Sequence, residues 1–361
     1  MEISPFPHQG PLEPSQVTGR DDLLADLTER VTERRVTALL GPRRFGKTSV
    51  LRRVAADLAD AGTSVIWVDL YEVTSTADLA RRFDAALAEA DGPVRWTLGE
   101  VAARVNLNLG FVGLELTRRR DERPDPDGLL DALLDTLVAG ASATATVVVI
   151  DEFPGIDRVP GATGLLRTKL QHHYQEIGLL FAGSQPSLMR TMFADRERPF
   201  YAQADLVEIG PLSRQDLTAF VEDGFRSTDR DPGDLGAHIH MFTGGHPYRS
   251  MQAADASWRL AEPGGGPVEW GAVLERLRSR TAMSCDAIFA GMTGGEKATL
   301  RLLAHGDALF GTVAELHDLS SGSARHARDT LVAAGDVIEV DGRYRIVDPV
   351  FADWIRQRFP R

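Results

Sequence analysis

The chain has 361 residues, 43% of them hydrophobic, which is enough for two or three domains with cores of their own. Its single cysteine, Cys285, excludes a disulfide framework and a cysteine-based zinc site, and fits a reducing cytoplasm. The net charge of −12 argues against a surface that coats nucleic acid broadly, and the lack of any run of about 18 apolar residues or of a signal-peptide pattern predicts a cytoplasmic protein without membrane contact.

The N-terminal segment, residues 1–20, is rich in proline and glycine and reads as a loop. An amphipathic helix is predicted to follow it, with Asp21 or Asp22 as the N-cap.

The most informative stretch is residues 41–48, which fits the pattern G-x-x-x-x-G-K-[ST]. It lies between an apolar run at 36–40 and a helical pattern at 47–61, which is the strand–loop–helix context of a phosphate-binding loop. The backbone N–H groups of such a loop form an anion cradle, Lys47 is predicted to reach the β- and γ-phosphates, and Thr48 to hold Mg²⁺. The predicted nucleotide-binding residues of this loop are Gly41, Pro42, Arg43, Arg44, Phe45, Gly46, Lys47, Thr48 and Ser49.

A strand pattern at 64–70 and a helix pattern at 76–90 come next, and this alternation predicts a parallel α/β sheet. Residues 95–120 look irregular. Alternation around two glycines at 105–116 predicts a small inserted hairpin, followed by an exposed charged loop at 118–127.

A second diagnostic stretch is residues 147–152, four β-branched apolar residues followed by Asp151 and Glu152. Ligands of α/β sheets bind at the carboxyl ends of the strands, so both acids are expected beside the phosphate loop. Asp151 is predicted to bind Mg²⁺ directly or through water, and Glu152 to orient and deprotonate the attacking water. A surface turn that happens to contain two acids is the alternative.

A helix near 164–177 and a third buried strand pattern at 178–185 follow, and the strand pattern ends in Ser184, our candidate sensor of the γ-phosphate. Simple turn chemistry at this position is the alternative. A last strand at 205–209 leads to Ser213, which is predicted to cap a helix together with Asp216.

The C-terminal half reads as helices followed by a hairpin. The predicted helices span residues 213–225, 234–242, 247–260, 270–283, 295–304, 313–319 and 323–334. Asp341-Gly342 between two short strand patterns is a strong hairpin signal, and three helices plus a hairpin predict a winged helix. Its third helix would offer Arg325, His326 and Arg328 to duplex DNA. However, residues 284–361 hold nine Lys and Arg against eleven Asp and Glu, a net of −2, which favours a protein or intramolecular contact over DNA.

Together these motifs resemble those of STAND-type P-loop ATPases close to AAA+ proteins, and in particular of the prokaryotic "archaeal ATPase" family. The segments that carry the resemblance are residues 17–23, 41–49, 147–153, 181–189, 243–247 and 342–354. The resemblance implies an α/β P-loop NTPase core over residues 1–211, with a parallel sheet flanked by helices and an insertion at about 95–125. A helical lid at 212–283 and a winged-helix domain at 284–361 would follow.

The resemblance also assigns residues around the nucleotide. Val17, Gly19 and Arg20 would lie against the adenine, and Pro247 would close over the nucleotide from the lid. Gln203 stands where the family often has an arginine, which leaves Arg249 as the candidate phosphate-sensing arginine. Turnover is therefore expected to be slow or to need a partner.

The leading hypothesis is a Mg²⁺-dependent ATPase that converts ATP to ADP and phosphate. Glu152, Lys47 and Ser184 are its candidate catalytic residues, and Thr48 and Asp151 its candidate Mg²⁺ ligands. Its nucleotide state is expected to control the domain arrangement and contact with a partner protein, with homo-oligomer formation on ATP binding as an option. One alternative is a DNA-binding initiator or helicase loader with nucleotide as a structural cofactor. The other is a nucleotide-locked scaffold without meaningful hydrolysis.

Overall fold

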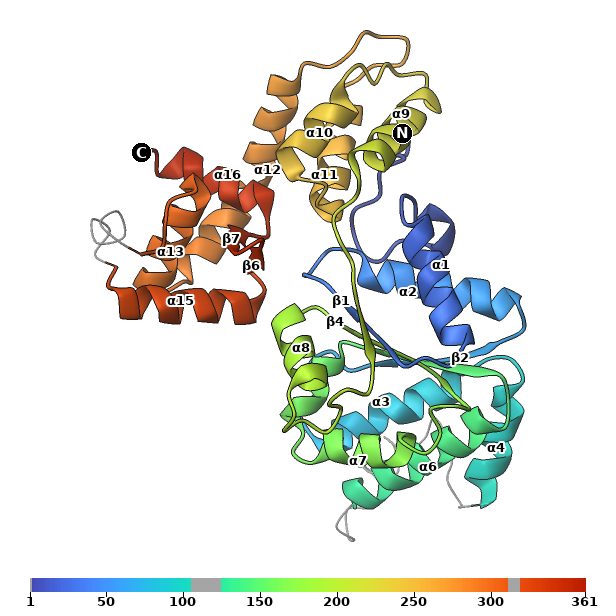
Figure 1. Cartoon of the computed structure of the whole chain (residues 1–361). Coiled ribbons are helices and arrows are strands. Elements are labelled where there is room, and N and C mark those ends of the chain that lie inside the picture. Colours follow the sequence, from blue (N-terminus) through green and yellow to red (C-terminus); the bar gives the residue numbers. More distant parts are fainter. Residues whose placement is uncertain (1, 105–124, 311–318) are drawn as a thin grey trace.

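The structure is a computed structural model that describes residues 2–104, 125–310 and 319–361. Figure 1 shows three parts: an α/β core in blue and green, a helical group in yellow and orange, and a C-terminal group in orange and red. Over the described ranges no helix combines the length and the apolar character that a membrane span requires.

The core is built on a five-stranded parallel sheet in the order β2-β3-β4-β1-β5. Its strands are β1 Thr37–Leu40, β2 Ser64–Asp69, β3 Thr146–Asp151, β4 Gly178–Gly183 and β5 Asp205–Glu208. The central strands are buried throughout because both faces of the sheet are covered, as near-continuous apolar runs predict for a parallel sheet. This confirms the predicted α/β fold class.

Alternate residues of each strand face opposite layers of helices. Leu39, Val147 and Val149 pack with the helices α1 Asp21–Thr32 and α2 Lys47–Asp60. Val148 and Ile150 pack on the other face, where the helices come from later in the chain. These helices are α3 Thr76–Glu89, α4 Val94–Arg104, α6 Pro126–Ser142, α7 Ala162–Leu170 and α8 Pro186–Ala194.

Two of these helices were missed in the sequence. The region from residue 95 was expected to be irregular, but α4 buries Val94, Leu98 and Ala102 at a spacing of four residues. The predicted loop at 118–127 contains the start of α6, since Asp125 accepts a hydrogen bond from the Gly128 N–H and a proline occupies the first turn. The predicted hairpin at 105–116 lies outside the described residues.

Two helix ends also differ from the prediction. The helix expected at 164–177 is α7 and already ends at Leu170. The residue at the N-cap of α1 is Arg20 rather than Asp21 or Asp22, which are the first two residues of the helix itself.

The helical group consists of α9 Arg214–Arg226, α10 Leu235–Thr243, α11 Pro247–Trp258 and α12 Trp270–Ala290. Ser213 caps α9 as predicted, accepting a hydrogen bond from the Asp216 N–H at 3.0 Å. The N-terminal segment joins this group, because the ring of Phe6 is buried against Phe220 with a centroid distance of 5.6 Å. Helix α12 runs past residue 283, where the prediction ended it, and its end packs in the core of the C-terminal group.

The C-terminal group contains α13 Gly294–His305, α15 Ser321–Ala334, α16 Pro349–Arg358 and the antiparallel pair β6 Val337–Val340 and β7 Arg343–Ile346. Asp341 and Gly342 both have positive φ, at 52° and 71°, as a tight Asp-Gly turn requires. The predicted helix at 313–319 lies almost wholly outside the described residues, so the winged-helix assignment stays a prediction.

Candidate functional site

The phosphate loop connects β1 to α2, and two glycines fix its path. A Cβ atom on Gly41 would lie 2.2 Å from Cγ2 of Ile209, so no larger residue fits there without movement of that side chain. Gly46 has φ of 85°, a left-handed conformation that glycine adopts without steric strain. The loop therefore begins helix α2 with free backbone N–H groups at its N-terminus.

Lys47 is the buried cation of this loop, with 5% of its surface exposed. Its Nζ donates hydrogen bonds of 2.9 Å to the carbonyl oxygens of Gly41 and Pro42. Burial lowers the pKa of Lys47 to about 8, while the negative charges of Glu152 and Asp151 oppose that shift. An anion near Nζ would relieve the unfavourable burial of this charge.

Asp151 meets the phosphate loop although it lies 103 residues beyond Thr48 in the chain. The Thr48 hydroxyl donates a 2.9 Å hydrogen bond to Oδ2 of Asp151. Burial raises the pKa of Asp151, and the hydrogen bond from Thr48 opposes the rise. One hydroxyl and one carboxylate oxygen are thus adjacent, and oxygen ligands of this kind fit Mg²⁺.

Glu152 and Ser184 contact each other at the carboxyl ends of β3 and β4. Oε2 of Glu152 accepts hydrogen bonds from the hydroxyl of Ser184 at 2.8 Å and from its N–H at 3.3 Å. Glu152 has φ of 49° and ψ of 42°, a left-handed conformation that is strained for a residue other than glycine. The structure therefore brings together the predicted water-activating acid and the predicted phosphate sensor.

Two adjoining cavities surround these residues. The smaller one, about 300 Å³, is lined by Gly10, Pro11, Arg43, Arg44, Gly46, Lys47, Thr48, Ser49, Tyr71, Glu152 and Ser184. The larger one, about 600 Å³, shares Gly10, Arg44, Gly46 and Ser49 with it and extends between the N-terminal segment and α11. The smaller cavity has a polar lining that includes Arg43 and Lys47, whereas the larger cavity is lined mainly by apolar residues, so the pair suits a ligand with an anionic part and an apolar part.

The residues expected around the adenine are distributed unevenly. Val17, Arg20 and Pro247 line the larger cavity, whereas Gly19 is not among its lining residues. The Arg20 guanidinium donates a hydrogen bond of 2.8 Å to the Gly210 carbonyl oxygen, which fastens the entry loop to the chain beyond β5.

Sequence reasoning missed other residues of this cavity, including Pro5, Pro7, His8, Tyr248 and Met251. Only the proline-rich composition of the first residues signalled an unusual segment.

Two loop residues reach across to the first turn of α11. The Arg44 guanidinium lies over the ring of Tyr248, 4.6 Å from its centroid, and the Phe45 ring packs edge-on against His246 at 4.8 Å. His246 is 4% exposed and accepts a hydrogen bond at the N-cap of α11. Burial lowers the pKa of His246 to about 4, so the ring is neutral at pH 7.

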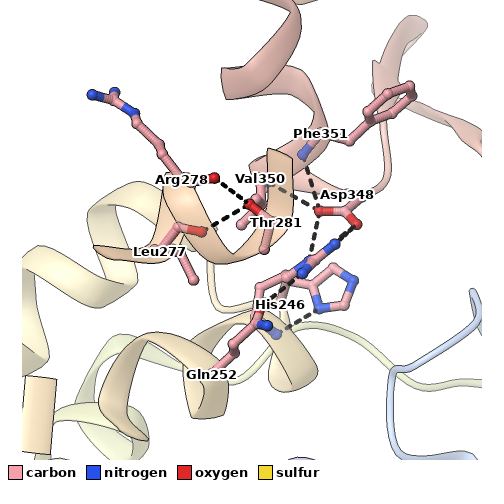
Figure 2. Close-up of polar contacts among 9 residues, drawn as sticks. His246, Gln252, Leu277, Arg278, Thr281, Asp348, Val350 and Phe351 are labelled. Atoms are coloured by element: carbon pink, nitrogen blue, oxygen red, sulfur yellow. Dashed lines mark hydrogen bonds and ion pairs between the residues drawn. The ribbon is translucent and has the colours of Figure 1, made fainter. Parts of the chain in front are cut away.

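Arg249, the candidate phosphate-sensing arginine, points elsewhere. Its guanidinium forms an ion pair with Asp348, including a bond of 2.9 Å from Nε to Oδ1, and it does not line either cavity. Asp348 also accepts hydrogen bonds from the N–H groups of Val350 and Phe351 at the start of α16, as Figure 2 shows. Arg249 is therefore a link between the helical group and the C-terminal group in this structure.

Comparison with known proteins identifies the core. Residues 29–192 match the family model of an AAA domain. This part of the chain is a P-loop ATPase domain of the AAA+ type. The AAA+ domain contains both the phosphate loop and the Asp151–Glu152 pair. Comparison with curated proteins gives no match.

Solved structures extend the similarity of fold beyond the AAA+ domain. A Walker-type ATPase of Pyrococcus abyssi is 18% identical, with a TM-score of 0.73 over 98% of this chain and 99% of that chain. The ORC2 protein of Aeropyrum pernix, solved with ADPNP and ADP, is 15% identical, with a TM-score of 0.55 over 99% and 98%. The ORC1 protein of Aeropyrum pernix in complex with DNA is 13% identical, with a TM-score of 0.50 over 94% and 93%. At these identities the similarity shows the fold alone.

Proposed function

We propose that the protein binds ATP with Mg²⁺, hydrolyses it to ADP and phosphate, and uses its nucleotide state to set the arrangement of its three parts. The observation that carries this proposal is the hydrogen bond between Thr48 and Asp151, which joins two motifs from separate strands beside a cavity that also contains Lys47 and Glu152.

The phosphate end of the site has a role for each polar side chain. The Thr48 hydroxyl and the Asp151 carboxylate would hold Mg²⁺, which would supply positive charge to neutralise the phosphates. Nζ of Lys47 would exchange its two carbonyl partners for phosphate oxygens. The nucleoside would occupy the larger cavity, against Val17, Arg20 and Pro247. Gly19, by allowing the turn at φ of 65°, would shape the loop there.

Glu152 would act as the general base. It would accept a proton from a water molecule whose oxygen bonds to the γ-phosphorus, while the bond from that phosphorus to the bridging oxygen breaks and ADP leaves with the electron pair. Because Ser184 holds the Glu152 carboxylate in this structure, this hydrogen bond has to loosen before the carboxylate reaches the water. The Ser184 hydroxyl would then be free to donate to the γ-phosphate.

The cations of the C-terminal group favour a STAND-type switch with a protein partner over a DNA-binding initiator. Of the cations expected to face DNA, Arg328 pairs with Asp329 and lies over the Tyr344 ring, 5.2 Å from its centroid. This leaves Arg325 and His326 as the exposed members of that set. The winged helix would then serve intramolecular or protein contacts, and assembly into a homo-oligomer on ATP binding stays an option.

The proposal is tested with the full-length chain by calorimetric titration of Mg²⁺-ATP and by phosphate release. We expect the wild-type chain to bind ATP and to release phosphate, and the Lys47→Ala variant to lose both. Lys169→Ala is a matched control, because Lys169 pairs with Asp131 and Asp135 outside both cavities. Failure of the wild-type chain to bind ATP in the presence of Mg²⁺ contradicts the proposal. Binding without phosphate release would instead support the nucleotide-locked scaffold.

A further inference from the structure

Tyr71 reaches the smaller cavity from the loop that follows β2. In the strand order β2-β3-β4-β1, this loop and the phosphate loop after β1 lie on opposite sides of Glu152 and Ser184, which follow β3 and β4. The Tyr71 side chain is 53% exposed, so it is not part of the hydrophobic core. Tyr71 therefore lines the side of the cavity that lies across from the phosphate loop.

The backbone of Tyr71 is held in place by hydrogen bonds from both sides. Its N–H donates a 2.8 Å hydrogen bond to Oδ1 of Asp69, and its carbonyl oxygen accepts one of 2.9 Å from the Arg82 guanidinium on α3. The preceding N–H, of Leu70, donates a 3.0 Å hydrogen bond to the carbonyl oxygen of Asp151. The loop is thus tied to α3 and to the strand that ends in the candidate Mg²⁺ ligand.

The loop also lies against the turn that begins with Glu152. A Cβ atom on Gly155 would be 2.1 Å from the Leu70 carbonyl oxygen, so only glycine allows the two backbones to approach this closely. Glu72 has φ of 53°, a left-handed conformation that is strained for a residue other than glycine. Such a conformation persists only where the surrounding contacts impose it, so the backbone of Tyr71 has a fixed position relative to the candidate general base.

The hydroxyl group of Tyr71 differs from the other side-chain hydroxyl groups that line this cavity. Those of Thr48 and Ser184 donate hydrogen bonds to carboxylates, and that of Ser49 accepts one of 3.0 Å from a backbone N–H. Within the part of the chain that the structure describes, the hydrogen bonds of Tyr71 involve its backbone, and its side chain makes none. Its O–H can therefore donate to a ligand without breaking another contact.

We propose that the Tyr71 hydroxyl donates a hydrogen bond to the terminal phosphate of the bound nucleoside triphosphate, across the cavity from Lys47. The inference rests on the proposed ATP binding. Hydrogen bonds to a charged oxygen are stronger than those between neutral groups, and a diphosphate lacks the terminal group, so Tyr71 would favour the triphosphate. Because the backbone of Tyr71 is fixed before the reaction, little reorganisation of this donor is needed during phosphoryl transfer.

The chemistry of the phenol also limits the size of the effect. The negative charge of the transferred group is spread over its equatorial oxygens. A neutral phenol donates a hydrogen bond to one of them but adds no positive charge, whereas an arginine does both. Tyr71 would therefore accelerate hydrolysis less than an arginine supplied by a partner, in keeping with the slow turnover expected of this chain alone.

The test separates the hydroxyl group of Tyr71 from its ring. Tyr71→Phe removes only the hydroxyl, and Tyr71→Leu removes the ring as well. The matched control is Tyr201→Phe, which removes a hydroxyl from another exposed tyrosine outside both cavities. For each full-length protein, calorimetry gives the affinity for ADP and for a non-hydrolysable triphosphate with Mg²⁺, phosphate release at saturating ATP gives the turnover, and chemical denaturation gives the stability.

We expect Tyr71→Phe to weaken triphosphate binding by about five- to tenfold and to lower turnover by about tenfold. Its ADP affinity and its denaturation midpoint should match those of the wild-type chain, because the diphosphate does not reach the hydroxyl and no contact within the protein is lost. Tyr71→Leu should lose at least as much triphosphate affinity and turnover as Tyr71→Phe. Tyr201→Phe should behave as wild type in all four measurements.

Wild-type triphosphate affinity and turnover in Tyr71→Phe would overturn this inference while leaving ATP binding intact, even if Tyr71→Leu were impaired, since the ring would then only cover the cavity. Equal losses of ADP and triphosphate affinity in Tyr71→Phe would also overturn it. Absence of nucleotide binding by the wild-type chain would instead remove the proposed function and this inference together.

Discussion

The smaller cavity is lined chiefly by the phosphate loop and by residues after β2, β3 and β4, whereas the larger cavity is lined by the N-terminal segment, the start of α2 and the first turn of α11. Apart from Gly10 and Pro11, the smaller cavity is therefore lined by residues of the AAA+ domain, whereas the larger cavity exists only while the helical group is in place. This difference separates the chemistry on the phosphates from the coupling between nucleotide binding and the domain arrangement. Side chains at the strand ends act on the phosphates, and the fit around the nucleoside depends on the domain arrangement.

The largest effect is expected at the strand ends. Glu152→Gln removes the general base, so turnover should fall by about 10² to 10⁴-fold while ATP affinity changes little. Phosphate release and calorimetry measure the two quantities on the same protein. The control Glu176→Gln changes a glutamate that pairs with His173 outside both cavities. Unchanged turnover in Glu152→Gln would contradict the claim that side chains of the smaller cavity carry out the hydrolysis.

The link between the helical and C-terminal groups should carry the next largest effect. Asp348→Ala leaves the guanidinium of Arg249, whose side chain is 7% exposed, without its ion pair and removes the N-cap of α16. The free energy of unfolding should fall by about 3–5 kcal/mol. Asp307→Ala, which breaks a pair with the exposed Arg361, should change it by less than about 1 kcal/mol. The free energies of unfolding are measured by chemical denaturation. Equal losses in Asp348→Ala and Asp307→Ala would show that the Arg249–Asp348 pair stabilises the protein no more than an exposed pair does.

A smaller, pH-dependent effect is expected at His246. Its folded pKa of about 4 lies below the ordinary value of 6.5, so the unfolded chain takes up the proton first. Stability should therefore be intact above pH 6.5 and fall as the pH drops toward 4, by about 1–2 kcal/mol between pH 7 and 5. His246→Asn keeps an N-cap acceptor and should remove this part of the pH dependence. Denaturation curves of both proteins at the two pH values test the difference.

The smallest effect concerns the larger cavity alone. Tyr248→Ala removes the partner of the Arg44 guanidinium and part of the cavity wall, so ATP affinity should weaken by about 1 kcal/mol, or roughly fivefold. Turnover at saturating ATP should stay near that of wild type. Tyr201→Ala, at an exposed position outside both cavities, is the control. A larger loss of turnover than of affinity would contradict the assignment of this cavity to the nucleoside.

The parts that sequence predicted are those whose signal is local. The phosphate loop needs two glycines, Lys47 and Thr48 between a strand and a helix, and all of these lie within a dozen residues. Asp151 is the last residue of its strand and Glu152 follows it, so the prediction of a parallel sheet was enough to place both beside the loop.

The parts that the sequence did not predict depend on contacts between residues far apart in the chain, or on a helical pattern that other residues interrupt. Arg249 was the candidate phosphate sensor because Gln203 stands where an arginine is often found. Its partner Asp348 lies 99 residues away in the chain, so the sequence did not reveal their ion pair. Residues 1–20 were predicted to be a loop, although Phe6 packs against helices more than 200 residues later in the chain. In α4 the apolar spacing was present, but Gly99 and the exposed Trp96 interrupt the pattern of an amphipathic helix.

The central claim is that Thr48 and Asp151 belong to one Mg²⁺-ATP site, and ATP affinity with and without Mg²⁺ tests it most directly. It should be measured by calorimetry on the wild-type chain, Thr48→Val, Asp151→Asn and the double variant. We expect Mg²⁺ to tighten ATP binding by the wild-type chain and to have much less effect on each single variant. Because both residues belong to one site, the double variant should lose no more of the Mg²⁺ effect than the single variant that loses more of it. An unchanged Mg²⁺ effect in both single variants would contradict the account.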